Sequence, residues 1–196
     1  DGRPRAGSKA RLQRILNTEK ALVGLLAEQE MTVTYRALNQ GILDQGVDSR
    51  IEDLKPLFLI WKKRRLVGIK RLDRQADSYR ITLLKDPEEL RKEVEARQAL
   101  ALACFEQLEK LVPDTSKLAD DAKQELRVKF SLLGLRAAMA EGMFGKEHDL
   151  KAIADALLFL HGMNVLSLQD GFMVMYQRMN VERVEQNVRK QYTQED

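Results

Sequence analysis

The sequence has very little of what metal binding, disulfide bonding or thiol catalysis requires. Its 196 residues include one cysteine and two histidines. A disulfide needs a second cysteine, and a zinc site needs a spaced set of His and Cys ligands that these three residues cannot supply. Cys104 lies in an apolar helical stretch, so we expect it to be an inert packing residue. We expect no cofactor, and a reducing cytoplasm as the compartment.

The chain also lacks the motifs of common enzyme classes. It contains no phosphate loop of the G-x-x-x-x-G-K type, no G-x-G-x-x-G and no G-x-S-x-G. No apolar run approaches the ~20 residues of a membrane span, and no signal peptide is visible. We therefore expect no catalytic residues and no membrane partner. Because the first residue is Asp1 rather than Met, we expect a piece of a longer protein.

Basic residues are concentrated in the first half of the chain, although the net charge is only +3. Residues 1–14 hold five basic residues against one acidic residue, and residues 50–80 hold ten against four. The remainder is therefore acidic. Such asymmetry is typical of a chain with a polyanionic partner on one side.

Composition and periodicity divide the chain into three expected parts. Residues 1–16 resemble a mobile basic arm or linker, 17–85 a compact domain, and 86–196 a second, helical domain. In 17–85 the hydrophobic period alternates between that of a helix and that of a strand. The expected elements are a helix from about Thr18 to Glu30, an edge strand at 31–34, helices at 35–44 and about 50–64, and a hairpin of strands 66–72 and 78–84. This order predicts a winged helix-turn-helix, in a chain that is mainly α with small β-hairpins.

The third of these helices is expected to pack through one apolar stripe. Pro56 is expected to kink it or to move its start to about Lys55. Asp48 or Ser49 would cap its N-terminus. In the hairpin, Tyr79 is expected to be more exposed than its inward neighbours. The stripe comprises Ile51, Leu54, Leu57, Phe58 and Trp61.

Cations gather at the end of this helix and in the hairpin. There they would neutralise phosphates and release counterions, giving an affinity that depends strongly on salt and little on sequence. Base reading needs exposed polar side chains near the helix start, where Ser49, Arg50, Asp53 and Lys55 stand. Backbone contact is therefore favoured over sequence reading. The predicted DNA-binding residues are Arg50, Lys55, Lys62, Lys63, Arg64, Arg65, Lys70, Arg71 and Arg74.

Residues 86–196 are expected to be largely helical. Asp86 as the cap and Pro87 as the first helical residue predict a helix to about Val112. A second long helix is expected at about 117–143. Asp149 would cap a helix to about His161, followed by a hairpin of strands 164–168 and 172–176.

The helix and hairpin of 149–179 repeat the apolar pattern of the first domain. Seven apolar positions match at a constant offset of about 99 residues, across the switch from helix to strand. The matching residues run from Ile51, Leu54, Phe58, Trp61, Leu66, Val67 and Ile69 to Leu150, Ile153, Leu157, Leu160, Val165, Leu166 and Leu168. The pattern favours a second winged-helix-like unit, although any helix leading into a hairpin would look similar.

The stretch Ala154–Met179, together with the closing Gln191-Tyr-Thr-Gln-Glu-Asp196, resembles a region of large bacterial RecQ-family ATP-dependent DNA helicases. The likeness covers about 45 residues. It implies an accessory region of a helicase beside two motor lobes, with winged helices that bind duplex near a fork. The family's ATP-binding and DEAH-type motifs are absent, so this chain alone is expected neither to hydrolyse ATP nor to unwind DNA. The hairpin tip at 73–77 would be the wedge that separates strands, but it lacks an apical aromatic residue.

Two other functions compete with the helicase interpretation. The chain is also compatible with a dimeric winged-helix transcription regulator, with the helices at 87–112 and 117–143 as its dimer interface. A third hypothesis is a protein-interaction module that docks partner subunits. For the first hypothesis the expected partners are DNA and the remaining helicase domains, in a cytoplasmic, nucleoid-associated protein.

Overall fold

A computed structural model describes residues 9–73, 77–111, 127–142, 148–169 and 173–175. The chain is mainly helical, with two small antiparallel sheets of three strands each. It divides into two compact units, Lys9–Ala96 and Arg97–Asp196. The division falls inside one helix, α4 (Pro87–Leu111). The three-part division expected from the sequence stays a prediction.

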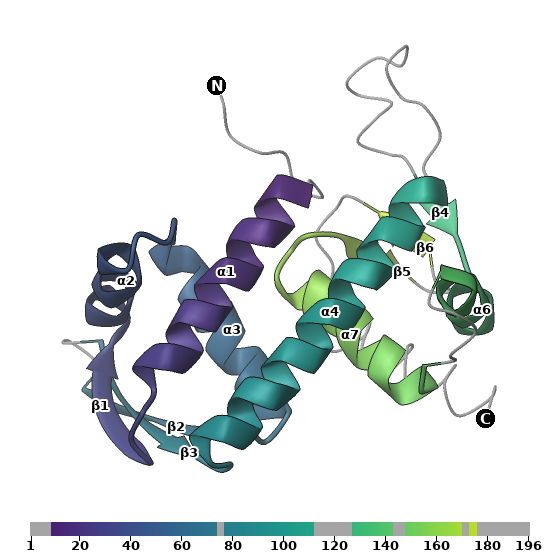
Figure 1. Cartoon of the computed structure of the whole chain (residues 1–196). Helices are drawn as coiled ribbons and strands as arrows, with labels where there is room; N and C mark the ends of the chain where they lie inside the picture. Colours follow the sequence, from purple (N-terminus) through teal and green to yellow (C-terminus); the bar gives the residue numbers. More distant parts are fainter. Residues whose placement is uncertain (1–8, 74–76, 112–126, 143–147, 170–172, 176–196) are drawn as a thin grey trace, which may run out of the picture. The chain divides into compact units, whose positions relative to one another are not determined.

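The first unit contains three complete helices, the beginning of α4 and a three-stranded sheet (Figure 1). Its strands pair in the order β1-β3-β2, so β1 lies at an edge as predicted. The observed positions of the strands, of α2 and of the hairpin agree closely with those expected. The elements are α1 (Lys9–Leu25), β1 (Glu30–Thr34), α2 (Tyr35–Asp44), α3 (Ile51–Lys63), β2 (Val67–Asp73) and β3 (Ser78–Leu83).

The start of α1 differs from the prediction. The helix begins at Lys9 rather than near Asn17, so half of the expected basic arm is helical. Leu12 and Ile15 on this added length are fully buried. Tertiary packing of these two side chains stabilises a stretch that composition alone marks as a linker.

Helix α3 also begins differently from the prediction. It starts at Ile51 and contains Pro56, so its start is not moved to Lys55. Its N-cap is Arg50, not Asp48 or Ser49. Leu54, Leu57, Phe58 and Trp61 are fully buried, as expected, but Ile51 is 44% exposed and does not belong to the buried stripe. The buried stripe begins at Leu54 because Ile51, the first residue of the helix, lies one turn earlier and outside the core.

The second unit contains two further helices and a second small sheet. The long helix predicted at 117–143 is confirmed for 132–142 and wrong for 127–129, which form a strand. Ser131 caps the helix that follows this strand by accepting a hydrogen bond from the Gly134 N–H at 2.9 Å. Residues 112–126 lie outside the described residues. So does the segment 180–192, where the polar sequence predicts a further helix. The elements after α4 are β4 (Arg127–Lys129), α6 (Leu132–Gly142), α7 (Leu150–Gly162), β5 (Ser167–Gln169) and β6 (Met173–Met175).

The two units repeat one another in topology. Each has the order strand, helix, helix, strand, strand, and the second sheet pairs as β4-β6-β5, which corresponds to β1-β3-β2. The offset of 99 residues aligns α3 with α7 at both ends. Both helices end in the same hydrogen-bonded turn: Leu66 N–H donates to the Trp61 carbonyl at 3.0 Å, and Val165 N–H donates to the Leu160 carbonyl at 2.9 Å. This six-to-one bond is that of a Schellman motif.

Candidate nucleic-acid interface

The exposed face of α3 carries three cations, one apolar residue and the acidic Glu52, which is exposed one turn before Lys55. Lys55, Leu59, Lys62 and Lys63 are all exposed and repeat at intervals of three and four residues, which places them on one side of the helix. The opposite side holds the buried Phe58 and Trp61 stripe. Leu59 is 47% exposed in the middle of the basic face, so the surface is basic but not purely polar.

The end of α3 adds two arginines in a sharply turned backbone. Arg64 is the C-cap residue, and Arg65 follows with a φ of +57°. The left-handed conformation costs a β-carbon-bearing residue roughly 1–2 kcal/mol, and asparagine tolerates it better than arginine. The turn directs the chain from α3 into β2 within three residues.

The hairpin continues the basic surface beyond the end of α3. Along β2, Val67 is buried and Lys70, Arg71, Leu72 and Asp73 are all exposed. The outer half of the strand is thus exposed on both of its faces. Arg80 on β3 is paired within the protein, because it forms an ion pair with Glu30 on β1 at 3.1 Å. Arg74 and the rest of the hairpin tip at 74–76 lie outside the described residues.

Several cations of this surface have no internal counter-ion. Within the part of the chain that the structure describes, five predicted DNA-binding residues form no ion pair. A cation without a carboxylate partner keeps its full charge for an external anion, whereas a paired cation does not. The five are Arg50, Lys55, Lys62, Arg65 and Lys70.

The start of α3 has fewer groups available for base reading than the sequence suggests. Ser49 is 7% exposed, and its hydroxyl donates to the Asn39 side-chain oxygen at 2.8 Å. Asp53 is 8% exposed and forms an ion pair with Arg14 at 3.3 Å. Two of the four candidate base readers are therefore structural, and Arg50 and Lys55 remain.

An aromatic stack fixes the hairpin to the helices. Tyr35 on α2 stacks on Tyr79 of β3, with ring centroids 4.6 Å apart, and on Phe58 of α3 at 5.8 Å. The Tyr79 hydroxyl donates to Asp77 at 2.8 Å. Burial, together with the neighbouring Tyr79, raises the pKa of Tyr35 to about 12. The prediction of an exposed Tyr79 is wrong: it is 8% exposed, because it stands two residues from Ile81 and so shares its buried face.

Trp61 and Cys104 are core residues, as expected. Trp61 is fully buried, and its indole N–H donates to the carboxylate of Glu19, also fully buried, at 2.8 Å. Cys104 is fully buried 3.6 Å from the sulfur of Met139, and burial raises the pKa of its thiol to about 12. Neither side chain is available to a ligand. In the described ranges, no cluster of three His, Cys, Asp or Glu residues could hold a metal ion.

Sequence reasoning missed the tertiary partners of the start of α3. Arg11 and Arg14 lie one turn apart on the same face of α1, and this face meets the segment 48–53. Thr18, one turn further along, donates its hydroxyl hydrogen to the Asp48 carbonyl at 3.2 Å. The only signal in the sequence was the basic composition of residues 1–14, which gave no indication of a partner.

The comparisons with known proteins identify no relative. No family model, no curated protein and no solved structure matches the chain. Across the described residues, none of the helices is both long enough and apolar enough to cross a membrane.

Proposed function

We propose that residues 9–96 form a winged helix-turn-helix whose α3 and β2–β3 hairpin hold the phosphates of DNA. The order of helices, edge strand and hairpin supports the fold, and the basic surface on α3 and β2 supports the ligand. Lysine and arginine side chains on such a surface contact phosphates and release counterions. The ligand is therefore bound mainly through its backbone.

The observation that carries this proposal is the contrast between the two repeats. At the offset of 99, the residues that correspond to Lys62, Lys63, Arg64 and Arg65 carry no permanent charge. The same Schellman turn thus forms without cations, so the fold does not need them there. Their presence in the first unit alone is explained by a polyanionic ligand. The corresponding residues are His161, Gly162, Met163 and Asn164.

We further propose that the chain is an accessory region of a RecQ-type ATP-dependent DNA helicase. The likeness of Ala154–Met179 to that family supports this assignment, and so does a DNA-binding surface without any nucleotide-binding motif. Hydrolysis and unwinding would then depend on motor domains elsewhere in the longer protein.

A salt titration of binding to fluorescein-labelled duplex DNA tests the proposal. The variant K62A/K63A/K70A should bind several-fold more weakly at about 0.1 M salt. Its slope of log affinity against log salt should fall by about 2, one each for Lys62 and Lys70, which form no ion pair within the described residues. The control variant K20A/K92A/K151A removes three exposed lysines elsewhere and should retain both values. If the two variants bound duplex DNA with equal affinity, the proposed DNA-binding surface on α3 and β2 would be refuted.

A protein-interaction module is the second candidate, favoured by the apolar residues on the same surface. Ile51, Leu59 and Leu72 are 44%, 47% and 40% exposed among the cations. Absence of DNA binding at low salt, combined with an intact fold, would favour this function. A light-scattering mass of a stable dimer would instead favour the transcription regulator.

A further inference from the structure

Strand β2 forms one edge of the first sheet, and its outer side has no partner strand in the described part of the chain. The strands pair in the order β1-β3-β2, so β3 lies along one side of β2 only. An edge strand presents backbone N–H and C=O groups that can pair with an added strand. The seven residues of β2 are enough for such pairing.

Two hydrogen bonds define which residues of β2 face the open edge. The Leu84 N–H donates to the Leu66 carbonyl at 2.9 Å, whereas the Leu83 N–H donates to a carbonyl on the β1 side at 2.7 Å. Along an antiparallel ladder, bonded pairs alternate with pairs whose backbone groups face outward. Val67 lies opposite Leu83, so it belongs to an outward-facing pair. The N–H and C=O groups of Val67 and, two residues further, of Ile69 therefore point toward the open edge.

Between these two residues stands Gly68, a glycine that the fold itself does not require. A β-carbon added there would meet only the β-carbon of Thr82, at 3.9 Å, which is an ordinary contact distance. The backbone at Gly68 is not left-handed. The second repeat has Ser167 at the corresponding position. A glycine inside a strand weakens that strand and often marks a place where another backbone approaches closely. An added strand at this edge would explain it.

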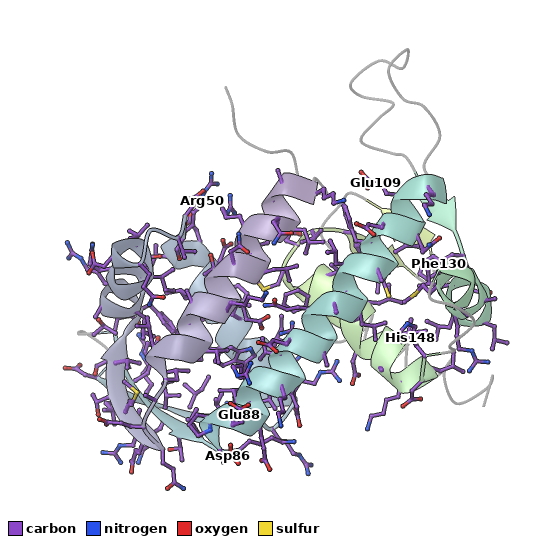
Figure 2. All side chains as sticks on the ribbon, viewed as in Figure 1. Arg50, Asp86, Glu88, Glu109, Phe130 and His148 are labelled. Carbon is purple, nitrogen blue, oxygen red and sulfur yellow. The ribbon has the colours of Figure 1, made fainter. Side chains whose placement is uncertain are left out.

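The outer half of β2 is basic. Lys70 and Arg71 are exposed, and Lys70 forms no ion pair within the described residues. The carboxylates of Asp86 and Glu88, which Figure 2 labels, belong to the start of α4 just after β3. Because β3 ends opposite the inner end of β2, they lie at that end of the strand. Asp73 follows only after the bulge at the outer end. A strand that carries carboxylates would therefore be attracted to this edge, and a basic strand repelled.

A second copy of the chain fits this edge poorly. Two β2 strands paired about a two-fold axis would place the lysines and arginines of both copies beside one another, and like charges destabilise a strand pair. Lysine on an edge strand commonly prevents such self-association. The second repeat has Gln169 in place of Lys70, so the fold does not need the charge. The other edge, β1, carries Glu30, which is already paired with Arg80. The charges thus favour a different, acidic partner.

We propose that the open edge of β2 binds an extended, acidic segment of a partner protein as a fourth strand of the sheet. The segment pairs with the outward backbone groups of Val67 and Ile69. On one face of the sheet an apolar residue of the segment packs beside the half-buried Ile69, and on the other face a carboxylate contacts Lys70. Since successive residues of a strand point to opposite faces, the segment alternates acidic and apolar residues. This site goes beyond the proposed function, because it depends on backbone groups that phosphate binding does not use.

The test uses a fluorescein-labelled peptide of eight residues in which glutamate and valine alternate. Its anisotropy is followed as the whole chain is titrated. The first control is the same peptide with every backbone amide N-methylated, which keeps the side chains and charges but removes the N–H donors; we expect it to bind at least about tenfold more weakly. The second control replaces each glutamate by lysine and should bind at least about tenfold more weakly as well. Equal binding of either control would overturn the inference.

A pair of variants tests the edge from the side of the protein. Ile69→Pro removes an N–H that points away from β3, and proline is tolerated at such edge positions. Ile69→Ala loses the same side-chain packing but keeps the N–H. We expect Ile69→Pro to bind the peptide at least about tenfold more weakly than Ile69→Ala. Fluorescence of Trp61, the single tryptophan, in the first unit, checks that both variants are folded. Equal peptide affinities of the two variants would overturn the inference, and the N-methylated control tests it on the unaltered chain if Ile69→Pro does not fold.

Duplex DNA separates this inference from the proposed function. Ile69→Pro and Ile69→Ala keep Lys62 and Lys70, so both should bind duplex DNA equally, with the same salt slope. Failure of the unaltered chain to bind the glutamate–valine peptide would overturn the inference and leave the proposed function standing. Peptide binding without any DNA binding would support the inference and overturn the proposed function. A dimer detected by light scattering and lost in Ile69→Pro would place a second copy on the edge and overturn the acidic partner.

Discussion

Replacement of Asp53 by alanine should destabilise the first unit far more than the removal of one surface ion pair. Asp53 and Arg14 have side-chain exposures of 11% and 8%, and their ion pair is 3.3 Å long. Removing one partner of a buried pair costs about 3–5 kcal/mol, because the other charge stays buried and unpaired. With an m value of about 2 kcal/mol/M, the urea midpoint should fall by about 2 M.

Substitutions of Asp53 and of Arg14 should not destabilise the unit equally, because the two residues have different charged neighbours. Asp53→Ala leaves the buried Arg14 without its carboxylate partner and beside the like charge of Arg11. Arg14→Met leaves Asp53 near the charge of Arg11, which compensates part of the destabilisation. We therefore expect D53A to destabilise the unit more than R14M. The double variant R14M/D53L should recover much of the stability, because it buries no unpaired charge.

Urea unfolding followed by Trp61 fluorescence measures these changes in the first unit. The control is Glu30→Ala, which removes the Arg80–Glu30 pair, whose side chains are 45% and 59% exposed. That pair should contribute less than about 1 kcal/mol. The reasoning would be refuted if D53A and E30A were destabilised equally, or if the R14M and D53A effects simply added in the double variant.

Two predictions concern the second unit. His161 is 4% exposed, its Nδ1 accepts from the Leu168 N–H at 3.2 Å, and burial lowers its pKa below 6.5. As the pH falls, the unfolded chain therefore binds a proton at His161 before the folded chain does. The free energy of unfolding should be complete above about pH 6.5 and decline as the pH falls through and below that value. Unfolding of His161→Gln followed by circular dichroism should lack this decline, and an equal decline would contradict the assignment. Because burial raises the pKa of Cys104 to about 12, iodoacetamide at pH 8 should label it only at the rate of opening. Rapid, complete labelling of the native protein would contradict its burial.

Local signals predicted much of the secondary structure. The turn residues around α2, the alternation of the β2–β3 hairpin, and the caps Asp86 and Asp149 all act over a few residues, so they can be read from sequence. The strand β4 was missed because three residues are too few to show a period of two. It forms by pairing with β6, more than 40 residues later in the chain.

The sequence also predicted some features of the candidate surface and missed others. The exposure of Lys55, Lys62 and Lys63 follows from their position opposite a clear apolar stripe. The burial of Tyr79 also follows from spacing, because Tyr79 stands two residues from Ile81 and shares its face of the strand. The burial of Ser49 does not, because it depends on Asn39 from another helix. Contacts between distant segments leave no periodic trace in the sequence.

The sequence by itself determined the order of helices and strands, the basic α3 with its hairpin, and the apolar repeat at an offset of 99, because each depends on residue spacing along one segment. Only the tertiary structure decided which charges remain available. It buried Arg14 against Asp53, paired Arg80 with Glu30, and left Arg50 as an N-cap without a counter-ion in the described residues. The physical reason is that burial and ion pairing join residues about 40 to 50 positions apart in the chain, at distances that spacing along the sequence does not encode.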